Sequence, residues 1–175
     1  MEQKVHSLVL SKTWSLVVLG TLAFSVPFVL AGPQFLVGSL VNFFLFSATL
    51  SLPIGFVLPL VILPSLGVLS RGLVFGPLTL FLFYLLPFIW LGNLGLILVF
   101  KKSRSFLGFL PAVILASLVK FSLLFLAASF WVRLGIIPVL FLKAMGFNQL
   151  ITALVGGILV FSLARSTDFL KSEKS

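Results

Sequence analysis

The residue best suited to chemistry is Lys120, the only charged residue between positions 105 and 132. A lysine at the centre of a membrane-spanning helix costs about 2.5–3.5 kcal/mol on insertion scales and usually marks a functional site. No carboxylate partner is at hand, because the three acidic residues, Glu2, Asp168 and Glu173, all lie in the terminal tails. Lys120 must therefore be neutral, snorkel to the outer interface, lean on backbone carbonyls and water, or face an anionic ligand.

Ser117 and Lys120 also have the spacing of a serine nucleophile and its lysine base in some hydrolases. One helical turn brings two such side chains together. The pattern has only two fixed positions, however, and the companion motifs of that family are absent. We therefore expect no catalytic residue and no enzymatic activity.

Polar side chains recur in the outer halves of other apolar stretches, at a depth similar to that of Lys120. In lipid an amide or hydroxyl needs a hydrogen-bond partner, so each of them alone is better explained as a bridge between helices. Their shared depth predicts a pocket that opens to the outside. The candidate substrate-binding residues are Lys120, Asn42, Gln34, Trp90, Asn93, Gln149 and Thr152.

The composition indicates that these residues lie in a membrane. Hydrophobic residues make up 61% of the 175 residues, charged residues 9%, and the mean hydropathy is +1.32. A soluble domain carries roughly 25% charged residues. The net charge of +9 does not indicate nucleic-acid binding, because most basic residues flank apolar runs, where they contact lipid headgroups and set topology. With no cysteine and a single histidine, His6, in the N-terminal tail, we expect no metal and no cofactor.

Six apolar stretches are long enough to cross a bilayer, which takes roughly 20 helical residues. Charges and the turn signals Ala31-Gly32-Pro33 and Leu52-Pro53 separate the stretches, since proline disfavours helix at the residue before it. Gly76-Pro77 and Pro87 indicate that the fourth helix starts late or kinks. The expected fold is an all-α integral membrane protein, one transmembrane domain over residues 1–175, with spans at about 13–31, 35–51, 54–70, 78–100, 106–131 and 147–165.

The distribution of Lys and Arg predicts the orientation. Apart from Lys120, one side of the membrane would hold Arg71, Arg133 and Lys143, and the other would hold Lys4, Lys12, Lys101, Lys102, Arg104, Arg165, Lys171 and Lys174. Both termini would then be cytoplasmic. A cleavable signal peptide ending at Ala31 is the alternative for the first span, although its apolar stretch is longer than usual. The apolar piece 135–142 is too short to cross and is expected to lie against the outer surface.

Three stretches carry a family resemblance. They are Gly32-Pro33-Gln34-Phe35 leading to Gly38-x-x-Val41-Asn42, then Leu86-Pro87-Phe88-Ile89-Trp90-Leu91-Gly92-Asn93, and Gln149-Leu150-Ile151-Thr152-Ala153-Leu154-Val155-Gly156-Gly157. In this order and at this spacing, over about residues 13–166, the chain resembles the substrate-binding S components of energy-coupling factor (ECF) transporters. The alanine pair that this family often carries on its first helix is absent here, where Gly20, Thr21, Ala23 and Ser25 stand instead.

The resemblance implies a protein of the bacterial cytoplasmic membrane that binds a vitamin or related micronutrient from outside. The pocket would lie among the outer ends of helices four to six and the interhelical loops. The implied partners are a transmembrane coupling subunit and two cytoplasmic ATPase subunits, with which the chain would topple to release its ligand. The chain itself has no Walker-type phosphate loop.

The second hypothesis is a structural or assembly protein of the membrane that transports nothing. Its polar residues would only bridge helices. The small residues four positions apart, Ala112 with Ala116 and Ala153 with Gly157, would only allow helices to approach closely.

Overall fold

The computed structural model describes the backbone of residues 2–30, 33–75 and 77–166, and the side chains of 11–30, 33–72 and 78–166. Every regular element within these ranges is helical. The elements are α1 (Glu2–Val29), α2 (Gln34–Ser51), α3 (Ile54–Phe75), the 3-10 helix η1 (Pro77–Phe81), α4 (Leu82–Leu107), α5 (Phe109–Arg133), α6 (Leu140–Met145) and α7 (Phe147–Ser166).

The expected fold class is confirmed in that these residues form six helical stretches long and apolar enough to cross a membrane. Part of what the sequence predicted lies outside the described residues. This applies to the turn at Ala31-Gly32, to the side chains of Lys4 and His6, and to the tail residues Asp168, Lys171, Glu173 and Lys174.

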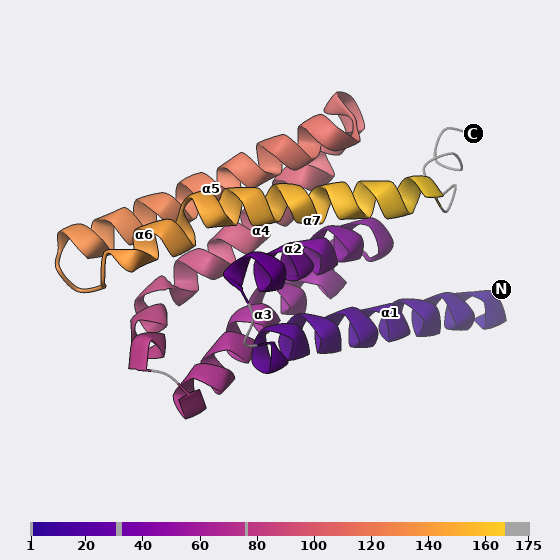
Figure 1. Ribbon diagram of the computed structural model, residues 1–175. Coiled ribbons are helices and arrows are strands. Elements are labelled where there is room, and N and C mark those ends of the chain that lie inside the picture. Colours follow the sequence, from indigo (N-terminus) through magenta and orange to yellow (C-terminus); the bar gives the residue numbers. More distant parts are fainter. Residues whose placement is uncertain (1, 31–32, 76, 167–175) are drawn as a thin grey trace.

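Consecutive long helices run back and forth along one direction, so the start of α1 and the end of α7 lie at the same end of the bundle (Figure 1). We call this the terminal end; it also holds the α2–α3 and α4–α5 joints. The opposite end, here the distal end, holds the α3–η1 joint and α6. An even number of long helices that alternate in direction brings the first and the last of them to the same end of the bundle.

Proline and glycine set the joints. Leu52, before Pro53, is extended (φ −124°, ψ 148°) and ends α2, as expected for a residue that precedes proline. Gly108 has a φ of 82°, which residues with a Cβ rarely adopt, and it alone separates α4 from α5. The helix therefore continues through Lys101 and Lys102, beyond residue 100, where we expected the fourth span to end.

The late start of the fourth helix is confirmed, because residues 77–81 form a 3-10 turn before α4 begins at Leu82. Pro87 lies inside α4, near its start. At the other end of the chain, α1 extends back to Glu2, well before the expected span.

Small residues allow the helices to pack closely. Ala112, Ala116 and Ala153 have no exposed surface. A Cβ on Gly156 of α7 would come within 2.8 Å of the Ser39 carbonyl oxygen of α2, so these two backbones touch. The predicted small-residue pairs on α5 and α7 thus serve packing inside the bundle.

Two apolar clusters leave room between them. The first joins α2, α3, α4, α5 and α7 around Phe46 and Phe100, whose ring centroids lie 4.9 Å apart. The second joins α4 and α5 to the distal segment around Leu124 and Phe141. The cavity described below is lined by members of both clusters, Val41 of the first and Phe141 and Met145 of the second, together with several polar side chains.

Candidate functional site

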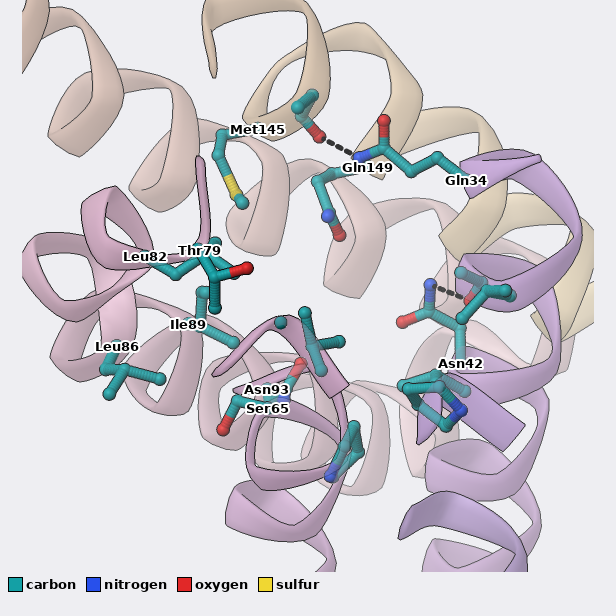
Figure 2. Close-up of a pocket in the computed structure, with 18 of the residues that line it drawn as sticks. Gln34, Asn42, Ser65, Thr79, Leu82, Leu86, Ile89, Asn93, Met145 and Gln149 are labelled. Carbon is teal, nitrogen blue, oxygen red and sulfur yellow. Dashed lines mark hydrogen bonds between the residues drawn. The ribbon is translucent and has the colours of Figure 1, made fainter. Parts of the chain in front are cut away.

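A cavity of about 480 Å³ lies in the bundle, walled by residues of all the long helices together with η1 and α6. Pockets for small molecules commonly measure about 300–1,000 Å³. Its wall includes five of the seven residues that the sequence singled out, and Figure 2 shows four of them, Gln34, Asn42, Asn93 and Gln149, around the opening. The fifth is Lys120.

Lys120 reaches across the bundle from α5 to α2. Its Nζ donates a hydrogen bond of 2.7 Å to Asn42 Oδ1, and the two residues are only 3% and 1% exposed. Space for its stem comes from α4, where a Cβ on Gly92 would lie 3.5 Å from Lys120 Cγ. The side chain therefore points into the bundle, and the snorkelling geometry is not the one observed.

Asn42 is held in a single orientation. Its Nδ2 donates to the Gly38 carbonyl at 2.8 Å and to Thr152 Oγ1 at 3.3 Å. Because both donor contacts lie on the Nδ2 side, Oδ1 is the atom that faces Lys120. Thr152 in turn donates to the Gln149 carbonyl at 3.2 Å. Thr152 is thus not part of the cavity wall; it orients the amide that is.

Trp90 and Asn93 tie α4 to α3. Trp90 Nε1 donates to Ser65 Oγ at 2.7 Å, and Asn93 Nδ2 donates to the Val61 carbonyl at 2.9 Å. Asn93 and Ser65 line the cavity, whereas Trp90 stands behind Ser65. Of the predicted residues, Trp90 and Thr152 therefore act by positioning a neighbour.

Gln34 links the beginning of α2 to the joint between α6 and α7. Its Nε2 donates to the Ala144 carbonyl at 2.8 Å, drawn as a dashed line in Figure 2, and its Oε1 accepts from Asn148 Nδ2 at 3.0 Å. Phe141 and Met145 of α6 line the cavity. We call these two hydrogen bonds of Gln34 the clasp, because they hold α6 over the cavity.

The segment 135–142 packs on the distal end of the bundle with one side. We expected it to lie against the outer surface; Ile137 and Phe141 are buried against α4 and α5, whereas Val139 and Leu140 are exposed. Gly135, with a φ of 69°, turns the chain back after α5.

Sequence reasoning missed Arg71, which lines the cavity from α3. In the sequence, Arg71 was interpreted only as the boundary between the third and fourth spans. Helical spacing could have indicated its position, because Pro64, Val68 and Arg71 follow one another at intervals of four and three residues and so lie on one face of α3. All three line the cavity. Thr79 and Met145 were missed as well, because each belongs to a short element with no clear periodicity.

Neither a serine hydrolase pair nor a metal centre is evident at the site. Ser117 has no exposed surface and donates to the Val113 carbonyl of its own helix at 2.7 Å, while the Lys120 amine bonds to Asn42. Within the described part of the chain, no three side chains of the His, Cys, Asp or Glu type gather where they could hold an ion.

Comparison with protein-family models, curated protein sequences and solved structures finds no match to this chain. The class that the fold and the cavity define is a helical, multi-pass membrane protein with a polar internal site.

Proposed function

We propose that this chain is the membrane-embedded, substrate-binding subunit of an uptake transporter, and that it captures a small anionic micronutrient such as a vitamin from outside. One observation carries the proposal. Lys120, 3% exposed, lines a cavity of ligand size in a chain with no acidic residue from position 3 to position 167. The site offers a buried amine without a countercharge, and an anionic ligand would hold this amine in its charged form.

The charge of the cavity wall supports an anion rather than a neutral ligand. Arg71 is the second cation on the wall. The other polar side chains of the wall are all neutral: Gln34, Asn42, Ser65, Thr79, Asn93 and Gln149. An amide or a hydroxyl cannot neutralise an ammonium as a carboxylate can. A ligand carboxylate or phosphate would gain charge-assisted hydrogen bonds there.

The distribution of basic residues supports an opening to the outside. Lys12 belongs to the first half of α1, and Lys101 and Lys102 belong to the last two turns of α4, so these residues are toward the terminal end. The cavity reaches α6 and η1 at the distal end. Because the Lys/Arg-rich side of a membrane protein is normally cytoplasmic, both termini would be inside and the cavity would face outward, in a bacterial cytoplasmic membrane.

Energy for import would come from partners. The chain lacks a Walker-type phosphate loop, so ATP hydrolysis would belong to two ATPase subunits reached through a transmembrane coupling subunit. The resemblance to ECF S components is the argument for this arrangement.

A structural or assembly protein is the second candidate. The observation in its favour is that Lys120 already has a partner, Asn42, at 2.7 Å. The same hydrogen bonds would be found in a protein in which these side chains only join helices. A structural or assembly protein would not use the cavity.

The experiment is a thermal-shift screen of the purified protein in a non-ionic detergent, against water-soluble vitamins, their precursors and neutral amide analogues. We expect at least one anionic compound to raise the midpoint by several degrees, because binding to the native state stabilises it by mass action. Lys120→Met should abolish the shift and Lys102→Met, at an exposed position, should not. Failure of every compound, or an equal shift in Lys120→Met, would contradict the proposal.

A further inference from the structure

The cavity wall is divided by polarity. Figure 2 shows Leu86 and Ile89 on one side of the cavity and Asn42 on the other. The amine of Lys120 belongs to the side of Asn42, because its Nζ lies 2.7 Å from Asn42 Oδ1. A ligand that fills the cavity therefore meets an amine at one place and hydrocarbon at another.

The apolar side is a stripe along one face of α4. Leu82, Leu86 and Ile89 follow one another at intervals of four and three residues, so they share a helix face, and all three line the cavity. We call these three residues the apolar stripe. Phe141 and Met145 of α6 add further hydrocarbon to the wall.

The apolar stripe runs from near the depth of Lys120 to the distal end. A Cβ on Gly92 would lie 3.5 Å from Lys120 Cγ, so this part of α4 is level with the lysine stem. Ile89 is about one turn nearer the distal end. Leu82 begins α4 beside η1, and it lies seven residues before Ile89, or about 10 Å by the helical rise.

Helix α2 gives the same depth independently. Gln34 begins α2 at the distal end, and Asn42, which accepts from the amine, follows eight residues later, or about 12 Å by the helical rise. Val37 and Val41, between them, line the cavity. On two helices, apolar side chains therefore fill the wall between the Lys120 amine and the distal end.

We infer that the substrate is an amphipathic anion, with a carboxylate or phosphate at one end of an apolar body about 10 Å long. The anion binds at Lys120, and the body lies along the apolar stripe toward the distal end. This inference rests on the proposed function and narrows its substrate class. Small hydrophilic anions bind weakly, because they leave the hydrocarbon of the stripe in contact with water.

The test uses straight-chain acids on the unmutated protein: butyrate, hexanoate, octanoate and dodecanoate, with octanamide as the uncharged analogue of octanoate. Isothermal titration calorimetry measures each Kd at one fixed concentration of a non-ionic detergent, so partition into micelles is the same for every variant. We expect octanoate to bind at least about tenfold more tightly than butyrate and than octanamide. Dodecanoate should bind no more tightly than octanoate, because its chain is longer than the stripe.

The double variant Leu86→Ala, Ile89→Ala shortens the side chains of the stripe. The advantage of octanoate over butyrate should fall at least about fivefold in it. Leu91→Ala is the matched control, a truncation in the same helix at a residue that is 53% exposed and outside the cavity wall. It should keep the full advantage.

The inference and the proposed function fail separately. Equal binding of butyrate and octanoate, an advantage that survives in the double variant, or a gain that continues to dodecanoate overturns the inference and leaves the proposed anion site intact. Equal binding of octanoate and octanamide contradicts the anion site as well. Binding of none of the acids also overturns the inference, and the vitamin screen with Lys120→Met then decides the proposed function.

Discussion

Lys120 Nζ and Asn42 Oδ1 lie 2.7 Å apart, and this hydrogen bond joins α5 to α2 between residues 78 positions apart in the sequence. The bond gives the amine an acceptor without giving it a countercharge. It therefore orients Lys120 at the cavity. In the proposed function the amine stays available to an anionic ligand, which a salt bridge at the same place would prevent.

Asn42→Asp tests this distinction. The new carboxylate would pair with Lys120 inside the bundle, so anion binding should weaken by at least about tenfold. Its second oxygen would lose the donor bond to the Gly38 carbonyl, so no gain in stability is expected. Asn42→Leu is the matched variant; it leaves the amine without an acceptor and should lower stability by about 1–3 kcal/mol. Thermal unfolding in detergent measures both. An Asp variant with undiminished anion binding would contradict the assigned role.

Gly156→Ala should loosen the contact between α7 and α2. The added methyl would come within 2.8 Å of Asn42 Cβ and of the Ser39 carbonyl oxygen, and 2.7 Å from the Phe43 nitrogen. Much of this is backbone, which cannot turn aside, and overpacking of this kind costs about 1–3 kcal/mol. The readout is the detergent unfolding midpoint.

Gly55→Ala is the control for this substitution. A Cβ at Gly55 in α3 meets nothing within 4 Å, and alanine is the better helix former. Its midpoint should therefore stay unchanged or rise. A drop equal to that of Gly156→Ala would show that replacing glycine is harmful in general and would remove the argument from close approach.

Gln34→Leu should free α6 from α2, because it removes both hydrogen bonds of the clasp. Exposed hydrogen bonds contribute little to global stability, about 0.5–1.5 kcal/mol each, so the effect should be local. Hydrogen exchange of residues 134–148 should become several-fold faster while α4 and α5 keep their protection. Ser15→Ala, which removes an exposed hydrogen bond within α1, is the control. Unchanged exchange in this segment would mean that apolar burial alone holds α6.

The orientation of the chain in the membrane can be tested by cysteine labelling without background from native thiols, because the chain has no cysteine. Single cysteines placed at Lys102 and at Lys143 lie toward opposite ends of the bundle. A membrane-impermeant maleimide added to intact cells should label Lys143→Cys and spare Lys102→Cys. The reverse pattern would turn the cavity toward the cytoplasm and contradict uptake from outside.

The sequence predicted the six long helices because apolar length and charge interruptions are strong one-dimensional signals. It did not locate the α4–α5 joint, because the run Lys101, Lys102 and Arg104 marks the end of an apolar span and not the end of the helix. Lysine and arginine are good helix formers, and the helix ends only at Gly108, where φ is 82°.

Five of the seven predicted residues line the cavity, but their hydrogen-bond partners could not be predicted. Polar groups avoid lipid, so depth alone brought Asn42, Asn93 and Lys120 to one cavity. Their partners depend on which helices meet, and a single sequence does not state that. The bonds from Lys120 to Asn42 and from Asn93 to Val61 follow from the packing of α5, α2, α4 and α3. Arg71 was missed because a charge at the end of a span has the same pattern whether it faces a headgroup or a cavity.

The central claim is that the cavity holds a small anion through Lys120. Native mass spectrometry of the protein purified in a non-ionic detergent from cells grown in rich medium tests it most directly. The account predicts one small-molecule adduct per chain, present in Lys102→Met and lost in Lys120→Met. Spectra in which the unmutated protein carries only detergent and lipid, or in which Lys120→Met retains the adduct, would contradict it.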